Sequence, residues 1–489
     1  MNTEFSFQNF ELKPELISAL DKLGYEIPTP IQKEAIPLLL GNHDIIAQAQ
    51  TGTGKTAAFA LPILSRCELT LSKPQSLIIT PTRELAIQVA EAFQSYAKQL
   101  SGFHVTPIYG GQDYRTQFKS LDRGPQVIVG TPGRVLDHLR RGTLDVECLK
   151  SIVLDEADEM LKMGFIEDIE SILEQLPKDR QTGLFSATMP DPIKKIAKRY
   201  LNNPKKVTIA ASHSHATAIE QSYICLTQNN KCEVLRRFLE IETVAAAIIF
   251  VRTKIATVEV ADKLRANGYA VEALNGDLNQ ARREKVIGQF KKGALDLVVA
   301  TDVAARGIDV DRVSHVINYD IPTDVESYIH RIGRTGRAGR QGKALLFVTP
   351  RERRLLKDIE NEIASAIDRV DPPTVEEMSL KRLESLASSV HNVIEKSKRL
   401  APYQEMVSEL IEKQQHQPED IAAALAYMLQ QSNPLPTEDI HSVAWDHKPT
   451  KTRRRNGRGR HPAERRAAAR RRKSAEPSNP KNKKSKRKK

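Results

Sequence analysis

The segment from Ala49 to Thr56, with the sequence Ala-Gln-Thr-Gly-Thr-Gly-Lys-Thr, limits the fold of this chain more than any other feature. Its two glycines, Gly52 and Gly54, let backbone N–H groups converge on phosphate oxygens without a Cβ in the way. Lys55 can then reach the β- and γ-phosphates of a nucleotide, and the threonine hydroxyl can complete the coordination shell of Mg²⁺. The segment is therefore predicted to be a phosphate-binding loop, although the general pattern begins with glycine and this one with alanine.

A loop of this kind lies between a buried strand and a helix. The run Asp44–Ala47 suits the strand, and Ala57–Leu61 starts a helical pattern. Further short β-branched runs alternate with helical patterns, at 76–80, 126–129, 151–154 and 181–185, and again at 247–251, 295–300 and 315–318. Such alternation is typical of parallel sheets covered by helices on both faces. We therefore expect two α/β domains, of which the first carries the phosphate-binding loop, with a nucleotide bound between them.

The acidic sequence Asp155-Glu156-Ala157-Asp158 directly follows the predicted strand 151–154. Asp155 is expected to hold Mg²⁺ through water, because this hard ion prefers carboxylate oxygens and keeps part of its hydration shell. Glu156 is the better candidate to orient or deprotonate the attacking water. Acidic residues at strand ends are also common as solvated charges, and the phosphate-binding loop upstream is what favours hydrolysis over that alternative.

Length and composition exclude several classes of protein. The 489 residues suggest about three domains, and 40% apolar residues are sufficient for compact cores. No stretch approaches the roughly 20 apolar residues of a membrane span, and the first residues lack the features of a signal peptide. The four cysteines form no Cys-x-x-Cys pair, which argues against a zinc site and for a reducing compartment. We expect a soluble, cytoplasmic protein.

The net charge of +13 belongs to the C-terminal tail. Residues 448–489 hold 20 Lys and Arg and 2 acidic residues, a net charge of +18, and the remainder has a net charge of −5. Binding of nucleic acid by the rest of the chain therefore has to be argued from motifs and not from bulk charge.

Short motifs follow one another in order between residues 7 and 340. They are Phe7 with Gly24-Tyr25 and Pro28–Gln32, then Pro81–Leu85, Gly110-Gly111, Thr131–Arg134 and Ser186-Ala-Thr188, and finally Phe250–Thr253, Gln280–Arg283, Ala300–Asp309 and His330–Arg337. Within this series Pro81–Leu85, Gly110-Gly111 and Thr131–Arg134 are each, taken alone, compatible with ordinary turn chemistry. Together, in this order around the loop and the acids, they make the sequence resemble the DEAD-box ATP-dependent RNA helicases, and in particular the bacterial cold-shock members.

The resemblance implies a domain organisation. The fold would be two tandem RecA-like parallel-sheet domains, a small α-helical module and a disordered basic tail. We expect the first domain at 1–208, with a Q motif at 5–33, a linker at 209–218 and the second domain at 219–370. The helical module would span 371–436 and the tail 437–489.

It also implies roles for individual residues. Gln32 would read the adenine edge, since its amide can donate and accept at once, and Phe7 and Tyr25 would flank the base. The phosphates would be held by Ala49, Gln50, Thr51, Gly52, Thr53, Gly54, Lys55 and Thr56, and the ribose by Asp309. RNA would be bound by Pro81, Thr82, Arg83, Gly110, Gly111, Thr131, Arg134, Arg252 and Thr301.

For catalysis, the resemblance assigns Glu156, Asp155 and Lys55 to hydrolysis, with Mg²⁺ held by Thr56 and Asp155. Arg334 and Arg337 would be arginine fingers that offset negative charge developing on the γ-phosphate. Ser186 and Thr188 would couple hydrolysis to duplex opening, and His330 would contact their cluster with the acids.

The implied mechanism is local and non-processive. ATP and single-stranded RNA together close the two domains and bend one strand, so a few base pairs of a short duplex separate, and hydrolysis reopens the domains. Contacts to sugar and phosphate would give little sequence preference and would favour RNA over DNA. Ribosome assembly, RNA decay and cold or stress adaptation, with their protein partners, are the cellular roles that the resemblance implies.

One departure from the family pattern is Asn275-Gly-Asp277, where His-Gly-Asp is common. Asn keeps one donor and the turn preference, so we expect little effect on activity, with a local RNA contact left in doubt.

The segment after the second domain is expected to contain three amphipathic helices. Thr374-Val-Glu-Glu377 is a capping box, and Pro402 and Pro418 suit the first turns of two further helices. The predicted apolar faces are Val375, Met378, Leu383, Leu386, Val390 and Ile394, then Met406, Leu410 and Ile411, then Ile421, Leu425 and Met428. These faces either pack against the second domain or form a homodimer, as in the cold-shock members.

The tail has two interpretations. It would hold RNA through counterion release, or it would serve as a solubilising or targeting segment. Two other classes also compete with the main hypothesis, namely a DNA translocase and an ATP-independent RNA chaperone that works through the tail.

Overall fold

The computed structural model describes residues 5–50, 52–209, 219–308, 310–336, 340–363, 365–397, 399–430 and 438–443. Three expected site residues, Thr51, Asp309 and Arg337, lie outside these ranges. So do nearly all of the expected linker, at 210–218, and the basic tail from residue 444 onward.

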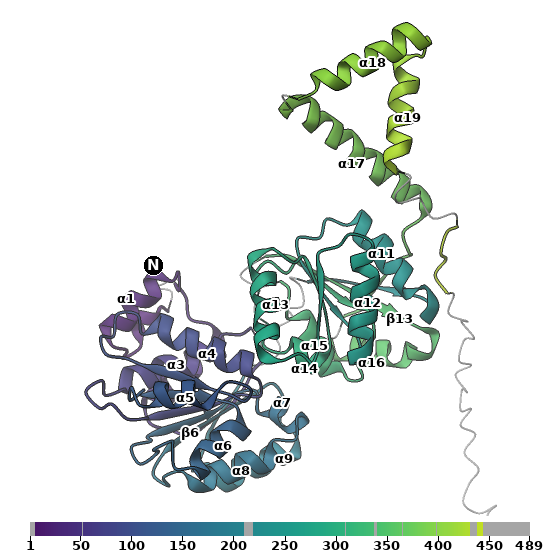
Figure 1. Ribbon diagram of the computed structural model, residues 1–489. Coiled ribbons are helices and arrows are strands. Elements are labelled where there is room, and N and C mark those ends of the chain that lie inside the picture. Colours follow the sequence, from purple (N-terminus) through teal and green to yellow (C-terminus); the bar gives the residue numbers. More distant parts are fainter. Residues whose placement is uncertain are drawn as a thin grey trace, which may run out of the picture. The chain divides into compact units, whose positions relative to one another are not determined.

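The first domain is a sheet of seven parallel strands with helices on both faces (Figure 1). In spatial order the strands are β3 (Val105–Ile108), β4 (Val127–Gly130), β2 (Ser76–Ile79), β5 (Ser151–Leu154), β6 (Gln181–Ser186), β1 (Ile45–Gln48) and β7 (Lys205–Thr208). The helices are α1 (Pro14–Lys22), α2 (Pro30–Leu40), α3 (Lys55–Arg66), α4 (Arg83–Tyr96), α5 (Tyr114–Leu121), α6 (Pro132–Arg140), α7 (Ala157–Lys162), α8 (Ile166–Gln175) and α9 (Asp191–Tyr200), with a 3-10 turn at Phe7–Asn9.

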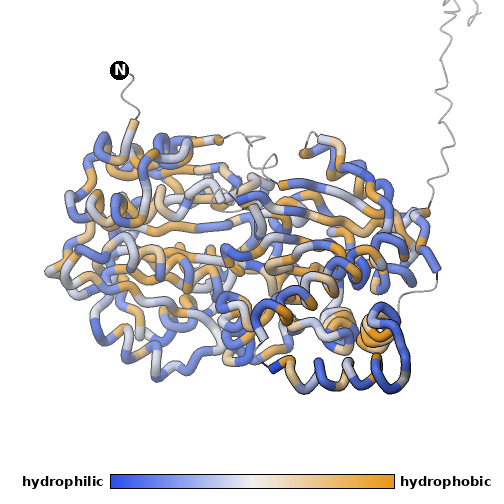
Figure 2. The backbone as a smooth tube through the Cα atoms, turned by 90° about the horizontal axis from the view of Figure 1, so that it is seen from above, coloured by the Kyte–Doolittle hydropathy of each residue, from blue (hydrophilic) through white to orange (hydrophobic). Residues whose placement is uncertain are grey.

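Alternation along each strand divides its side chains between two hydrophobic cores. In β1, Ile45 and Ala47 pack in the core under α1–α4, whereas Ile46 packs in the core under α6–α9. Inner strands such as β2, β4 and β5 are buried along their whole length. Figure 2 shows hydrophobic and hydrophilic residues alternating along the coiled, helical stretches of the backbone.

The second domain repeats this plan, again with seven parallel strands. In spatial order they are β10 (Val271–Leu274), β11 (Leu297–Ala300), β9 (Ala247–Phe250), β12 (His315–Asn318), β13 (Gly342–Val348), β8 (Ile219–Cys225) and β14 (Asp368–Arg369). The helices are α11 (Lys231–Ile241), α12 (Lys254–Ala266), α13 (Gln280–Lys292), α14 (Asp302–Ala305), α15 (Val325–Ile332) and α16 (Arg353–Ile363), with 3-10 turns at Gln228–Asn230 and Pro350–Glu352. The expected tandem RecA-like architecture is therefore confirmed.

Three helices follow, α17 (Val375–Lys396), α18 (Ala401–Gln414) and α19 (Pro418–Gln430). The predicted capping box is present, since the Thr374 hydroxyl accepts from the Glu377 N–H at 3.1 Å and the Glu377 carboxylate accepts from the Thr374 N–H at 2.8 Å. Pro402 and Pro418 both lie in first turns, as expected.

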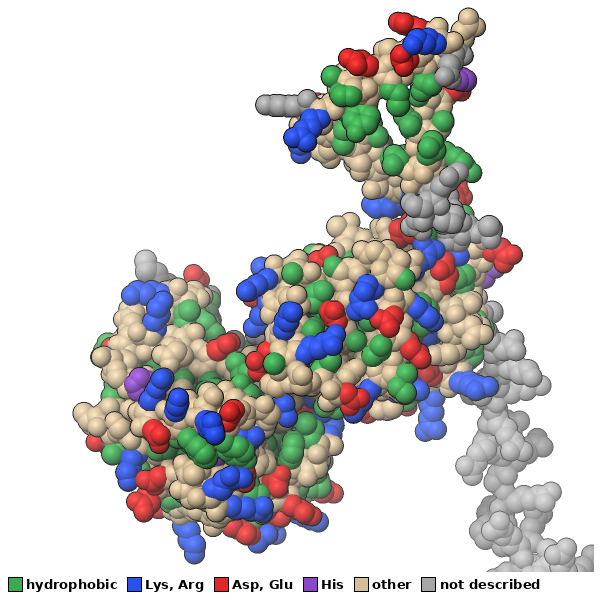
Figure 3. Space-filling model, in the orientation of Figure 1, with side chains coloured by type: hydrophobic (Ala, Val, Ile, Leu, Met, Phe, Trp, Pro, Cys, Tyr) green, Lys and Arg blue, Asp and Glu red, His purple; other side chains and the backbone are tan. Residues whose placement is uncertain are grey.

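The apolar faces of these three helices remain largely exposed. Met378 and Ile421 are buried, but Leu383, Ile394 and Met428 are 54%, 65% and 66% exposed. Hydrophobic side chains gather on the sides of α17, α18 and α19 that face one another (Figure 3). Packing against the second domain therefore accounts for the first turn of α17 and not for the rest of these faces.

Among the described residues, none of the helices has the length and hydropathy that crossing a membrane requires.

Candidate functional site

Parallel strands bring the segments that follow them to one edge of each sheet. In the first domain this edge carries the phosphate-binding loop after β1, Pro81–Arg83 after β2, Gly110-Gly111 after β3, Thr131 after β4 and the acids after β5. In the second domain the same edge carries Arg252 after β9, Asn275 after β10 and Thr301 after β11. The predicted motifs are therefore gathered by topology, although they are far apart in the sequence.

The phosphate-binding loop requires glycine at position 54 for two reasons. Its backbone is left-handed, with φ +91°, and a Cβ there would lie 2.4 Å from Nε2 of Gln32. That same Nε2 donates to the Gly54 carbonyl oxygen at 3.1 Å. Gln32, the residue predicted to contact the adenine, is therefore hydrogen-bonded to the phosphate-binding loop.

Lys55 is the first residue of α3 and is 7% exposed. Its Nζ is buried and has no hydrogen-bond partner within the described part of the chain. Burying an unpaired ammonium group is costly, so the position is suited to an anionic phosphate group. The residues present therefore fit a nucleoside triphosphate.

The predicted adenine-binding residues lie together. The Gln32 side chain is 1% exposed, and its Oε1 accepts from the Thr29 N–H at 2.9 Å. Phe7 and Tyr25 pack edge to face with ring centroids 6.1 Å apart, and the hydroxyls of Tyr25 and Tyr96 are 3.1 Å apart. Phe7 is 3% exposed and belongs to the core, so its stacking on a base stays a prediction.

Asp155 and Glu156 follow β5 and have different environments. Burial raises the pKa of Asp155 to about 7, against the opposing charge of the nearby Lys55. A divalent cation would offset that desolvation, so Asp155 together with the Thr56 hydroxyl suits Mg²⁺. Glu156 has φ 52° and ψ 50°, a left-handed backbone that costs a non-glycine residue about 1–2 kcal/mol. Its N–H donates to Asp155 Oδ1 at 3.0 Å, and such strain is typical of functional positions.

Asp158 connects the acids to Ser186-Ala-Thr188. Its Oδ2 accepts from the backbone N–H groups of Ala187 at 3.1 Å and Thr188 at 2.8 Å, and from the Thr188 hydroxyl at 3.0 Å. Its own N–H donates to the Ser186 hydroxyl at 3.2 Å. The contact between Ser186, Thr188 and the acids that the sequence predicted is therefore present.

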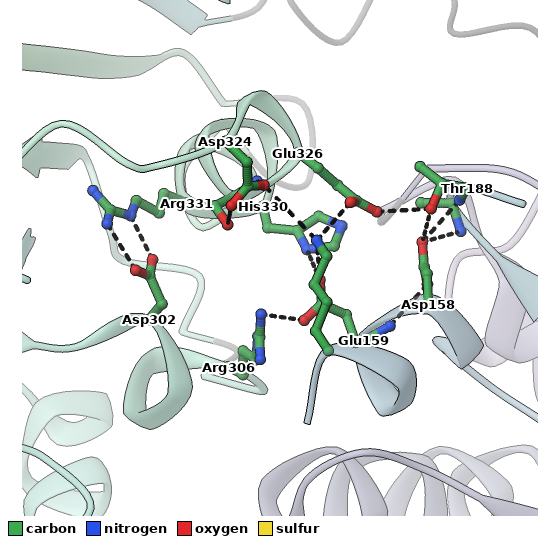
Figure 4. Close-up of polar contacts among 12 residues, drawn as sticks. Asp158, Glu159, Thr188, Asp302, Arg306, Asp324, Glu326, His330 and Arg331 are labelled. Atoms are coloured by element: carbon green, nitrogen blue, oxygen red, sulfur yellow. Dashed lines mark hydrogen bonds and ion pairs between the residues drawn. The ribbon is translucent and has the colours of Figure 1, made fainter. Parts of the chain in front are cut away.

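A cluster of charged groups joins the two domains beside this contact. Figure 4 shows Glu326, His330 and Arg306 of the second domain near Thr188, Asp158 and Glu159 of the first. The Thr188 hydroxyl lies 3.0 Å from Glu326 Oε1, and Lys162 Nζ lies 2.5 Å from Glu326 Oε2.

Glu159 lies at the centre of this cluster and is fully buried. Its carboxylate pairs with Arg306, with His330 Nδ1 at 3.1 Å and with Lys162 Nζ at 3.1 Å. Burial alone would raise the pKa of Glu159, but the hydrogen bond with His330 and the charge of Arg306 lower it to about 2. Although Glu159, Glu326 and His330 could together offer ligands to a metal, the carboxylates already have cationic partners.

Two buried arginines of the second domain, Arg331 and Arg334, make different contacts. Arg334 donates to the carbonyl oxygens of His330 at 3.2 Å and Ile308 at 3.1 Å. Burial lowers the pKa of Arg334, and the charge of Glu156 opposes that effect, so the guanidinium lies within electrostatic reach of the predicted base. Arg331 pairs through two nitrogens with Asp302, at 2.5 and 2.8 Å, and holds the segment after β11 against α15.

The predicted RNA-binding residues of the first domain lie on or beside the edge. Arg83 donates to Gln280 Oε1 of the second domain at 2.9 Å, and a Cβ on Gly111 would come within 2.5 Å of its Nη1. Arg134 stacks on the Tyr114 ring at 3.9 Å and donates to Gln117 at 3.0 Å.

Thr131 and Thr301 precede the first turns of α6 and α14, and neither hydroxyl caps its helix. Arg252 pairs with Glu352 at 3.2 Å and is half exposed. These positions stay predictions as RNA contacts.

Asn275 is 5% exposed, and its amide donates to the Thr257 hydroxyl at 2.7 Å and accepts from the Asp277 N–H at 3.1 Å. The side chain therefore organises its own turn, in agreement with the turn preference expected of Asn.

Glu159, Lys162, Arg306, Glu326 and Arg331 were not singled out from the sequence. Glu159, Lys162 and Glu326 lie one to four residues outside the named motifs, where charged residues look like any solvated surface. Arg306 and Arg331 lie inside the motifs Ala300–Asp309 and His330–Arg337 but were given no role. Burial alone distinguishes them, and burial requires the fold.

Comparisons with known proteins show the family to which the chain belongs. Residues 29–196 match the model of the family described as DEAD/DEAH box helicase, residues 230–339 that of the helicase conserved C-terminal domain, and residues 373–440 that of the RNA helicase DeaD dimerization domain. The chain is 51% identical over 434 residues to the ATP-dependent RNA helicase DeaD of Buchnera aphidicola subsp. Schizaphis graminum, covering 89% of this chain and 72% of that protein.

Identity to the ATP-dependent RNA helicase DeaD of Escherichia coli strain K12 is 52% over 430 residues, covering 87% of this chain and 68% of that one. Among solved structures, S. cerevisiae Dbp5 bound to RNA and ADP BeF3 is similar, with a TM-score of 0.69 and 37% identity over 75% of this chain and 95% of that chain.

Proposed function

This chain belongs to the DEAD-box ATP-dependent RNA helicases of the DeaD type, and we propose that it opens short RNA duplexes locally by closing its two sheet domains around ATP and RNA. As a member of this family it is an enzyme that hydrolyses ATP. The roles of individual residues in ATP hydrolysis and in RNA binding are part of the proposal.

The observation that carries the proposal is the chain of contacts from the hydrolysis acids to the second domain. Asp158 receives three hydrogen bonds from Ala187 and Thr188, and the Thr188 hydroxyl lies equally close to Glu326. Any rearrangement at the acids is thereby transmitted to α15 and to the buried arginine Arg334. A nucleotide-binding protein without mechanical output has no need of such a connection.

In the hydrolysis step, Lys55 binds the β- and γ-phosphates from the amino end of α3. Mg²⁺, held by Thr56 and through water by Asp155, would offset the negative charge of the phosphates. Glu156 would orient the attacking water and accept its proton, and Arg334 of the second domain would offset negative charge developing on the γ-phosphate. Gln32 and Tyr25 hold the adenine.

RNA contacts would be made to the sugar–phosphate backbone, since the predicted residues are Arg, Thr and Gly at strand ends and offer no base-reading pocket. Arg83, Arg134, Thr131 and Thr301 supply donors at the same edges that close on ATP. A strand held by both domains is bent in a way that a duplex cannot follow, so its base pairs separate.

A homodimer is the function that we propose for α17–α19. Their exposed apolar side chains, Leu383, Ile394 and Met428 among them, form a surface that a soluble monomer seldom keeps. The match of 373–440 to the RNA helicase DeaD dimerization domain supports this use of the surface.

The experiment that tests the proposal is Glu156→Gln. The variant should bind ATP and RNA as the wild type does, accumulate in the closed form and lose RNA-stimulated hydrolysis by about 100-fold or more, the usual scale for loss of a general base. Hydrolysis at the wild-type rate would refute the role given to Glu156. Stimulation by single-stranded DNA as strong as by RNA would favour a DNA translocase instead.

A further inference from the structure

The Thr188 hydroxyl lies between two carboxylates that come from different domains (Figure 4). Its Oγ1 is 3.0 Å from Asp158 Oδ2 and 3.0 Å from Glu326 Oε1. A hydroxyl has one hydrogen and donates one hydrogen bond, so only one of the two carboxylates can accept it. The other must bring a proton of its own, or its oxygen faces the hydroxyl oxygen with no hydrogen between them.

Asp158 is the carboxylate that accepts. Its Oδ2 also receives the backbone N–H groups of Ala187 and Thr188, and such donors favour the ionised form. Although burial by itself would raise the pKa of Asp158, hydrogen bonds with Glu326, with the Ser186 hydroxyl and with the Thr188 N–H outweigh it and lower the pKa.

Glu326 is the carboxylate that is protonated more readily at this contact. Protonated at Oε1, it donates to the Thr188 hydroxyl, and its Oε2 still accepts from Lys162 Nζ at 2.5 Å. Every polar atom of the contact is then satisfied. Burial raises the pKa of Glu326 and the proximity of Asp158 raises it further, while Lys162 opposes both.

We propose that Glu326 is a positioning residue that takes up one proton when the two domains close, so that closure around ATP and RNA is coupled to protonation. This inference rests on the proposed function, since it concerns the closed form that ATP and RNA bring about. Glu326 touches neither reactant, and it acts by fixing Thr188 and, through Thr188, Asp158.

Other charged groups surround Glu326 and also affect its protonation. They are Asp158, Glu159 and Lys162 on α7 and Asp324, His330 and Arg306 in the second domain. Glu159 pairs with Arg306 and contacts the His330 ring, whereas Lys162 favours an ionised Glu326. The count of hydrogens at Thr188 favours the protonated form, and Lys162 can still donate, although more weakly, to the carbonyl oxygen of a protonated carboxyl group.

The sign of the pH dependence follows from linkage. In the open form Glu326 should have the ordinary pKa of a glutamate, about 4.3. Closure raises that pKa, so protons favour the closed form. The contribution is complete below about pH 4.3, falls by up to about tenfold in the closure constant per pH unit above it, and is lost once the pH exceeds the raised pKa.

The test uses the full chain with a donor dye on the first domain and an acceptor dye on the second, and measures closure by energy transfer. A non-hydrolysable ATP analogue and single-stranded RNA are present at saturation, from about pH 4.5 to 8.5, a range that begins near the ordinary pKa of a glutamate. Glu326→Gln is the test variant, since its amide donates to Thr188 and accepts from Lys162 without titrating. Glu220→Gln is the control, because Glu220 is an exposed carboxylate on β8 of the same domain.

The wild type and Glu220→Gln should close less as the pH rises. Glu326→Gln should lack that component and be at least about tenfold more closed than the wild type at the alkaline end. The same pH profile for Glu326→Gln and the wild type would overturn the inference, as would weaker closure of Glu326→Gln at every pH with intact ligand affinity. A wild type that does not close with both ligands would overturn the proposed function as well.

Lys162→Met provides a second test should Glu326→Gln fold poorly. Removal of the ammonium group removes the charge that favours an ionised Glu326, so the midpoint of the pH profile should move upward. A downward or absent shift contradicts the proposal.

Discussion

Replacing Gly307 by alanine should oppose closure of the two domains without unfolding either. Gly307 follows α14 in the second domain and has φ +74°. A Cβ there would lie 2.8 Å from Glu84 Cβ, 2.9 Å from the Leu85 nitrogen and 3.0 Å from Thr82 Oγ1, all at the amino end of α4 in the first domain. The added methyl group therefore has no room in the closed form.

The free-energy cost of the alanine has two parts, one present in both the open and the closed form and one present in the closed form only. A left-handed backbone costs alanine about 1–2 kcal/mol, and this cost is present whether the domains are open or closed. Overlap with the first domain adds about 1–3 kcal/mol in the closed form only, the usual cost of an extra methyl group in a packed contact. The closure constant should consequently fall about 5- to 150-fold.

Energy transfer between dyes on the two domains, with an ATP analogue and RNA bound, measures this constant directly. Gly268→Ala is the matched control, because Gly268 has φ +85° in the second domain but no atom within 4 Å of the added Cβ. It should lower the melting temperature and leave closure unchanged. If Gly307→Ala closed as readily as Gly268→Ala, the contact between Gly307 and α4 would not belong to the working closed form.

Three further outcomes are expected. Gly54→Ala should weaken binding of a fluorescent ATP analogue about 10- to 100-fold, because left-handed strain adds to loss of the Gln32 hydrogen bond, and unchanged affinity would contradict the fit of the loop. A chain ending near Ser432 should be dimeric by light scattering, and Leu383→Glu with Ile394→Glu should make it monomeric; a wild-type monomer at micromolar concentration would exclude the dimer. Deleting 448–489 should weaken RNA binding at low salt and leave ATPase turnover at saturating RNA nearly intact, and unchanged affinity would favour the solubilising interpretation of the tail.

Much of the fold was accessible from the sequence because the inner strands are nearly continuous apolar runs. The predicted runs at 76–80, 151–154 and 315–318 are strands β2, β5 and β12 with ends shifted by no more than one residue. The edge strands β3 and β7 were not named, since Pro107 and the pair Lys205-Lys206 interrupt any apolar pattern, as is common at sheet edges.

The site likewise contains residues that the sequence predicted and residues that it did not. Residues with special backbone or chemical demands, such as Gly54, Lys55 and Asp155, stand in recognisable patterns. Glu159 and Glu326 do not, and Arg306 stands in a named motif without a role of its own, because these residues are defined by burial between two domains and by partners more than 130 residues away in the sequence. Sequence spacing has no means of pairing such residues until both sheets are placed.

The central claim is that strand separation depends on ATP bound at Lys55. The most direct test compares separation of a short fluorescent RNA duplex by the full wild-type chain and by Lys55→Ala, each with ATP. The wild type should separate the strands with RNA-stimulated hydrolysis, and Lys55→Ala should do neither, because the buried ammonium group that holds the phosphates is gone. Strand separation by Lys55→Ala at the wild-type rate would contradict the account and would favour an RNA chaperone that acts through the basic tail.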